Sequence, residues 1–131
     1  MLFRSWLQQT DRNLGLLLSY LEENFREDEY LVSLYSDHGA PIFAPPSSDI
    51  IDVISECSTS AAWMMRGAGV PEGVTVDDLT SSIDIYPTLG KLCGYPVADG
   101  IDGQLPAIFG GTARDAVYSA EIGRASCRER V

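Results

Sequence analysis

A short apolar segment that runs straight into polar residues sets the main limit on how this chain can fold. Residues 30–35 read YLVSLY and are rich in residue types that favour β-structure. A strand that is apolar on both faces is typical of a parallel sheet covered by helices. The segment continues directly into Ser36, Asp37, His38 and Gly39, and the glycine would let the backbone turn sharply there. We therefore expect a buried parallel strand whose carboxyl end presents polar side chains.

The flanking segments alternate between helical and strand patterns. Residues 5–25 predict an amphipathic helix, because apolar side chains recur at steps of three and four; they are Leu7, Leu14, Leu17, Leu18, Leu21 and Phe25. Gly15 interrupts this helix at a cost of about 1 kcal/mol relative to alanine, which indicates close packing against another element. Residues 61–65 (AAWMM) predict a second strand, and residues 116–119 predict a third.

Residues 84–93 predict a second helix. Asp84 is a suitable N-cap, Pro87 falls in the first turn, and Gly94 is a suitable glycine just beyond the end. Three side chains are expected to face inward: Leu89, Leu92 and Cys93. The prolines, serines and acidic residues of 40–59 predict a long irregular loop of a kind that is often functional. The order of helices and strands predicts an α/β fold.

Length and charge restrict the function further. The chain has 131 residues, which suits one domain, and 19 acidic residues against 9 basic ones give a net charge of −10. This balance argues against general binding to nucleic acid or to an anionic membrane, but it suits a bound cation. No apolar run reaches the roughly 18 residues of a membrane-spanning helix. The three cysteines, Cys57, Cys93 and Cys127, show no CxxC spacing and predict no disulfide framework.

The last eleven residues differ from the rest. Residues 121–131 read EIGRASCRERV, have no apolar period and hold three of the basic residues. The string looks like the translation of a sequencing adaptor. We expect an artefactual tail, with a natural basic tail as the alternative, and we exclude it from the fold prediction.

Asp37 and His38 are the strongest candidates for chemistry. Ligands of open α/β sheets collect beyond the carboxyl ends of strands, where these two residues stand. A carboxylate beside a neutral imidazole can bind a divalent cation. His38 is the only histidine, so this chain alone cannot build a multi-histidine zinc site. The simpler alternative is that Asp37 ends a turn and His38 is an ordinary surface residue.

Other polar groups are weaker candidates. Asp77 and Asp78 read as an exposed acidic turn. Cys57 has no basic neighbour that would activate its thiol. The serines lack both a second histidine and a GxSxG pattern; they are Ser36, Ser58 and Ser60. Residues 63–65 are expected to fill the core, and residues 67–69 lack the flanking lysine of a phosphate loop.

Four stretches in order resemble the sulfatase family of the alkaline-phosphatase superfamily. Residues 11–21 (DRNLGLLLSYL) are similar to the family helix D-x-x-x-G-x-L-L-x-x-L, and residues 31–39 (LVSLYSDHG) to the strand ending in S-D-[HN]-G. Residues 61–73 (AAWMMRGAGVPEG) resemble the PLIIRGPGVPEG turn. Residues 82–94 (SIDIYPTLGKLCG), followed by Asp102 and Gly103, resemble the D-[IL]-x-P-T-L segment and its trailing DG.

The resemblance implies a partial alkaline-phosphatase-like α/β/α sandwich with a mostly parallel sheet. Family members hydrolyse sulfate esters, of small molecules or glycans, with a nucleophile on a divalent metal that is usually calcium; zinc and manganese are the alternatives. Asp37 and His38 match the family's metal ligands.

The chain also departs from the family. The C/S-x-P-x-R motif that yields the formylglycine nucleophile is missing, and so are the upstream aspartates of the metal site. The only lysine, Lys91, lies in the second predicted helix rather than soon after the DHG segment. We therefore expect residues 1–120 to be part of a catalytic domain without its N-terminal half, and inactive alone.

Two other functions stay open. A phosphodiesterase or phosphonate hydrolase of the same superfamily is one, because the DH form is common where two transition metals bind. A non-catalytic acidic α/β module that binds a partner through the leucine-rich helix is the other. Family members are often periplasmic or secreted, and any signal peptide would lie upstream of Met1, so the compartment and the oligomeric state stay open.

Overall fold

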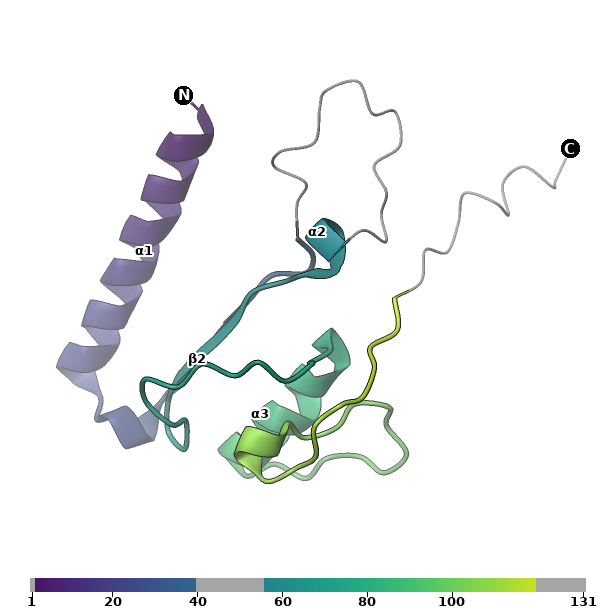
Figure 1. Cartoon of the computed structure of the whole chain (residues 1–131). Helices are drawn as coiled ribbons and strands as arrows, with labels where there is room; N and C mark the ends of the chain where they lie inside the picture. Colours follow the sequence, from purple (N-terminus) through teal and green to yellow (C-terminus); the bar gives the residue numbers. More distant parts are fainter. Residues whose placement is uncertain (1, 40–55, 120–131) are drawn as a thin grey trace, which may run out of the picture. The chain divides into compact units, whose positions relative to one another are not determined.

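The computed structural model describes residues 2–39 and 56–119, and Figure 1 shows their elements along the chain. The longer elements are α1 (Leu2–Asn24), β1 (Leu31–Tyr35), α2 (Glu56–Thr59), β2 (Trp63–Gly67) and α3 (Ile85–Cys93). Short 3₁₀ helices span Glu27–Glu29, Ser82–Asp84 and Ala107–Phe109. The α/β class is confirmed. Most of the predicted loop, the tail at 121–131 and Cys127 lie outside the described residues.

The chain divides into two compact units, and each contains one end of the strand pair. The first unit comprises Met1–Val32 and Met65–Glu72, and the second comprises Ser33–Met64 and Gly73–Val131.

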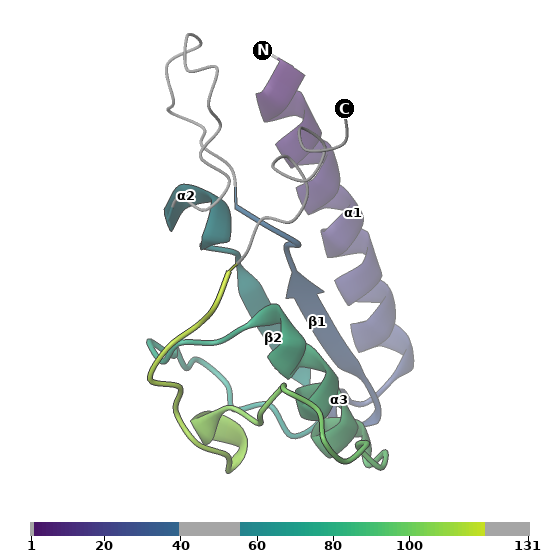
Figure 2. The same cartoon turned by 90° about the vertical axis from the view of Figure 1, so that its right-hand side faces the viewer.

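β1 and β2 pair antiparallel, and Figure 2 shows them side by side. The Ser36 N–H donates to the Ala62 carbonyl at 3.0 Å, and the Ala68 N–H donates to the Tyr30 carbonyl at 2.8 Å. The two strands therefore run in opposite directions, and the prediction of a parallel strand at 30–35 is wrong for this pairing. Side chains of β1 are half-buried or exposed rather than buried on both faces, because the described sheet has only two strands.

In the first unit, α1 confirms the predicted helix but not its packing. Leu14, Leu18 and Leu21 are half-buried, whereas the rest of the apolar stripe is exposed. Among the described residues, no atom lies within 4 Å of a Cβ built on Gly15, so this part of the chain does not provide the close packing predicted for this glycine. Among the described residues, none of the helices combines the length and apolar character needed to span a bilayer.

A salt bridge connects α1 to β2 within the same unit. Arg66 donates from Nη1 to Glu22 Oε1 at 2.6 Å, and its Nε lies 3.5 Å from Glu27 Oε1. All three side chains are about half exposed, so solvent screening keeps the contribution of this bridge to stability small.

In the second unit, α3 lies within one residue of its predicted bounds. Gly94 ends it in the left-handed conformation at φ 71°, and the Tyr95 N–H donates to the Gly90 carbonyl at 2.8 Å. Leu89 and Leu92 are half-buried, but Cys93 is exposed, so its predicted inward position is wrong.

Residues 116–119 form no strand. In this part of the described chain, β-structure is limited to one antiparallel bridge between Leu79 and Arg114.

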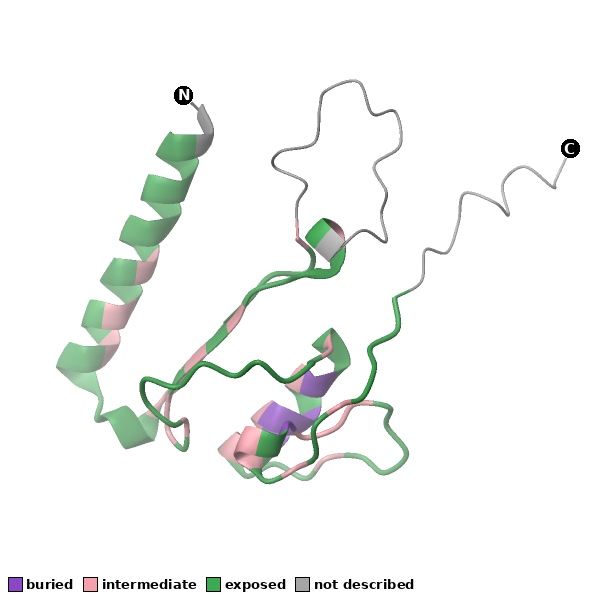
Figure 3. Ribbon diagram, viewed as in Figure 1, coloured by how far each residue is buried: buried purple, intermediate pink, exposed green. Residues whose placement is uncertain are grey.

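The most enclosed part of the described chain surrounds α3 and is polar at its centre. Figure 3 shows buried residues concentrated there, and these include Pro87, Thr88 and Gly90. Asp84 is 1% exposed, and its carbonyl accepts a 2.7 Å hydrogen bond from the Thr88 hydroxyl. Among the described residues no large hydrophobic side chain is fully buried.

Candidate metal centre

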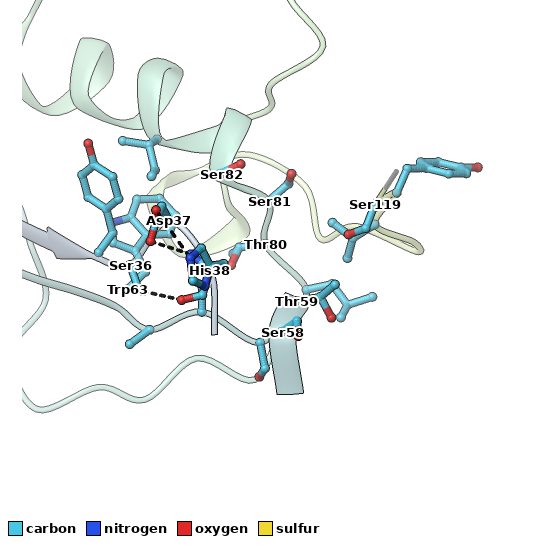
Figure 4. Close-up of a pocket in the computed structure, with 18 of the residues that line it drawn as sticks. Ser36, Asp37, His38, Ser58, Thr59, Trp63, Thr80, Ser81, Ser82 and Ser119 are labelled. Atoms are coloured by element: carbon cyan, nitrogen blue, oxygen red, sulfur yellow. Dashed lines mark hydrogen bonds and ion pairs between the residues drawn. The ribbon is translucent and has the colours of Figure 1, made fainter. Parts of the chain in front are cut away.

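Asp37 and His38 lie next to each other just beyond the end of β1, at a pocket in the second unit (Figure 4). Asp37 Oδ2 and His38 Nε2 are 3.8 Å apart. Both side chains face solvent, with 88% of the Asp37 side chain and 71% of the His38 side chain exposed. The structure therefore brings together the two residues that the sequence analysis selected.

Backbone contacts fix the turn that carries the pair. The His38 N–H donates to Asp37 Oδ1 at 3.0 Å, and the Ser36 hydroxyl donates to the His38 carbonyl. The Gly39 N–H donates to the Ser58 carbonyl at 2.8 Å. One carboxylate oxygen of Asp37 is thus held by the turn while the other faces the imidazole.

Gly39 is required by close backbone approach. The backbone bends at Asp37 and His38, but the φ of Gly39 is not among the positive values. A Cβ at this position would lie 2.1 Å from the Cys57 carbonyl oxygen and 2.6 Å from that of Ser60. The backbone of α2 and of Ser60, the residue that follows it, therefore packs directly against the backbone of the DHG turn.

The imidazole is oriented by its other nitrogen. His38 Nδ1 lies 2.6 Å from the Gly39 carbonyl oxygen, so a proton on Nδ1 is donated to that oxygen. The neutral ring then carries its lone pair on Nε2, which faces Asp37 Oδ2. Metal-binding histidines commonly donate their second N–H to a carbonyl in this way.

The spacing of the two free atoms fits a shared cation. Two atoms that each lie roughly 2.0–2.6 Å from one ion are at most about 5 Å apart, and the observed 3.8 Å is below that limit. Among the described residues, no third His, Cys, Asp or Glu joins them in a potential metal-binding cluster. The described chain therefore offers two of the ligands that a cation needs.

The pocket beside this pair is rich in hydroxyl groups. Its volume is about 600 Å³. Hydroxyl side chains come from several segments: Ser36, Ser58, Thr59, Ser60, Thr80, Ser81, Ser82 and Ser119. Tyr35, Trp63 and Tyr118 add aromatic surface, and Asp78 adds a carboxylate. The described lining contains no lysine or arginine, so its own fixed charge is negative or neutral.

Trp63 shows where the core prediction was wrong. It is only half-buried, it lines the pocket, and its indole N–H donates to the Ser33 hydroxyl at 3.0 Å. Met64 is 57% exposed. Residues 63–65 therefore do not fill a core in the described part of the chain, because β2 has one partner strand and one open edge.

The remaining candidates lie at exposed positions. Lys91 is exposed on α3 and is not part of the pocket lining, and Cys57 is exposed on α2. Asp77 is exposed, as predicted, whereas its neighbour Asp78 also lines the pocket.

Sequence reasoning missed the Asp84–Arg114 pair behind the pocket. Asp84 precedes α3 at the N-cap position, but its side chain does not cap that helix. Its carboxylate instead accepts from the Ser81 N–H at 2.9 Å, from the Gln104 N–H at 2.8 Å and from Arg114 Nε at 2.8 Å. Nothing in the sequence marks Arg114 as the partner, because 30 residues separate the two.

Opposing effects act on the Asp84 carboxyl. Burial pushes its pKa upward, but the hydrogen bonds from Arg114, Gln104 and Ser81 together outweigh burial, and the pKa lies below its ordinary value. The same hydrogen bond raises the pKa of Arg114. Both groups therefore stay charged at neutral pH.

Comparison with known proteins gives a consistent relationship. The chain is 30% identical over 115 residues to "Arylsulfatase K" of Danio rerio, a match that covers 86% of this chain and 21% of that protein. It is 27% identical over 95 residues to "Arylsulfatase K" of Homo sapiens, covering 72% of this chain and 18% of that protein. No protein-family model matches the chain, and no solved structure does. The chain is thus similar in sequence to sulfatases, and it spans about a fifth of the length of the relatives it matches.

Proposed function

We propose that this chain supplies part of the active site of a metal-dependent hydrolase that cleaves sulfate esters of small molecules or glycans. Asp37 and His38 are two ligands of its divalent cation, with calcium as the first candidate and zinc or manganese as alternatives. One observation carries the proposal: Nε2 of a properly oriented imidazole faces a free carboxylate oxygen at 3.8 Å.

The residues of this chain have separate tasks in that reaction. The Gly39 carbonyl keeps the imidazole proton on Nδ1 and leaves Nε2 free as a ligand. The His38 N–H holds one oxygen of Asp37 and leaves the other free. A cation bound there would neutralise ester oxygens and stabilise the charge that develops during displacement. The hydroxyl groups of the pocket would orient the polar parts of the substrate.

We further propose that the chain belongs to an alkaline-phosphatase-like α/β/α sandwich and has no sulfatase turnover by itself. The similarity to the two arylsulfatases supports the first part. The second follows from the sequence, because no C/S-x-P-x-R motif occurs in it. Turnover of an aryl sulfate by the purified chain, dependent on added metal, would contradict this part of the proposal.

The choice of metal separates sulfatase from phosphodiesterase chemistry. An imidazole nitrogen is a good ligand for zinc, whereas calcium and manganese prefer oxygen. If Asp37 and His38 bind zinc more tightly than calcium, the phosphodiesterase or phosphonate hydrolase alternative is favoured. Competition between the two ions at the same site measures this preference.

A titration that follows the imidazole of His38 tests the metal site directly. His38 is the only histidine, so its ring signals in a proton–carbon NMR spectrum are unambiguous. We expect added Mn²⁺ to broaden the His38 ring signals at lower concentration than the signals of exposed side chains elsewhere. Excess Ca²⁺ or Zn²⁺ should restore them by competition.

Two variants make this experiment specific. Asp37→Asn should weaken the Mn²⁺ effect on His38 about tenfold or more, because it removes the charged ligand. Asp99→Asn changes another exposed carboxylate, one outside the pocket lining, and should leave the effect unchanged. Equal weakening by both variants would show that the ion only follows the net charge of −10.

A further inference from the structure

The Asp84 carboxylate ties together separate segments of the second unit. Ser81 precedes α3, Gln104 lies in the following coil, and Arg114 lies further along that coil. Each donates to the same carboxylate, and Arg114 does so through both Nε and Nη2. A carboxylate that accepts from a guanidinium through two nitrogens holds its partner in orientation as well as in distance.

Arg114 is held by its backbone as well. It forms the antiparallel bridge to Leu79, and its Nη2 also donates to the Asp102 carbonyl at 3.3 Å. The Arg114 side chain is 15% exposed and that of Asp84 is 2% exposed. Enclosure on this scale makes the loss of either partner costly, because little water is present to replace the lost contact.

Both segments that meet at this pair continue into the pocket. Leu79, Ser81 and Ile85 line the pocket on the Asp84 side. Residues 117–119, which begin three positions after Arg114, line it as well. Figure 4 shows Ser81, Ser82 and Ser119 around the same cavity as Asp37 and His38. The ion pair therefore stands behind two walls of the cavity.

We infer that Asp84 and Arg114 are positioning residues of the candidate active site: their ion pair holds residues 117–119 against the residues before α3, so that both walls face Asp37 and His38. This inference rests on the proposed function for its significance. The buried ion pair would place this wall of the pocket whether or not a metal binds.

A nitroxide attached to Cys57 provides the test. Cys57 is exposed and is followed directly by residues 58–63, which line the pocket. With Cys93 and Cys127 replaced by serine, the label should strongly reduce the intensity of the amide signals of residues 117–119 in the full chain. Arg114→Gln should restore those intensities to the values of the reduced label, while the α3 signals keep their chemical shifts.

Two further variants separate positioning from general stability. Arg114→Lys keeps the charge but cannot donate through two nitrogens, and we expect it to restore the intensities partly. Arg66→Gln removes an exposed salt bridge in the first unit and should leave them unchanged. The inference is wrong if residues 117–119 keep their broadening in Arg114→Gln. It is equally wrong if both Arg114 variants lose the α3 signals together with the coil, since the pair would then be a general stability element.

The label experiment can also be interpreted separately from the proposed metal site. If Mn²⁺ does not affect His38 but the label effect depends on Arg114, the proposed function fails and the positioning inference holds. If Mn²⁺ binds at His38 and the label effect survives in Arg114→Gln, the reverse is true.

Discussion

At the scale of single residues, the ionisation of Asp84 depends on its neighbours more than on its burial. Burial alone would raise the pKa of this carboxyl, yet Arg114 and two backbone amides lower it below the ordinary value of 3.8. A carboxyl with a lowered pKa in the folded state stabilises that state above its unfolded pKa. This contribution is lost as pH falls below about 4 and through the lower folded pKa.

Removing Arg114 should reverse the shift. In Arg114→Gln the burial remains while the main hydrogen-bond partner is gone, so the pKa of Asp84 should rise from below 3.8 to above it. The chemical shift of the Asp84 carboxyl carbon, followed in an NMR pH titration, measures both midpoints. A midpoint that stays below 3.8 in the variant would show that the amides of Ser81 and Gln104 suffice.

A second residue-scale prediction concerns Gly39. Gly39→Ala places a methyl group against the carbonyl oxygens of Cys57 and Ser60, which are backbone atoms and cannot rotate away. We expect a loss of about 1–3 kcal/mol in the local stability of this turn. Faster hydrogen exchange of the amide at position 39, which pairs with Ser58, would measure it. Gly15→Ala, at an open position, should leave this amide unaffected.

At the scale of elements, local patterns predicted the helices well and the sheet poorly. The apolar period placed α1, and Pro87 and Gly94 placed α3 within one residue, because these signals act within a single turn of helix. Asp84 marked the start of α3 correctly, although its side chain does not cap the helix. The direction of strand pairing depends on which segments meet, and residues 30–35 carry no information about that.

The same distinction explains the site. Asp37 and His38 lie close together because adjacent residues share a turn, whatever the rest of the fold does. The roles of Trp63 in the pocket and of Arg114 behind it were not predicted, because each depends on a partner 30 residues away. Long-range pairing of this kind leaves no periodic signal in one sequence.

α1 offers a prediction that belongs to the element itself. Gly15→Ala should stabilise this helix by about 1 kcal/mol, because alanine restricts the unfolded chain and meets no atom within 4 Å. Helical content by circular dichroism and slower amide exchange in α1 would measure the gain. A loss of stability would show instead that another surface packs against this glycine.

At the scale of the whole molecule, the distribution of burial predicts how the chain unfolds. The first unit contains α1, whose large side chains are exposed or half-buried, while the second unit contains the enclosed residues around α3. Local stability follows buried contacts, so the two units should not open together. We expect amides of α1 to exchange with solvent at least tenfold faster than those of Thr88 and Gly90.

Thermal unfolding should then give different midpoints for the total helical signal and for the α3 amides, so the transition should not be two-state. Coincident midpoints, with equal protection in both helices, would mean that α1 shares a core with α3 and that the two units form a single cooperative structure.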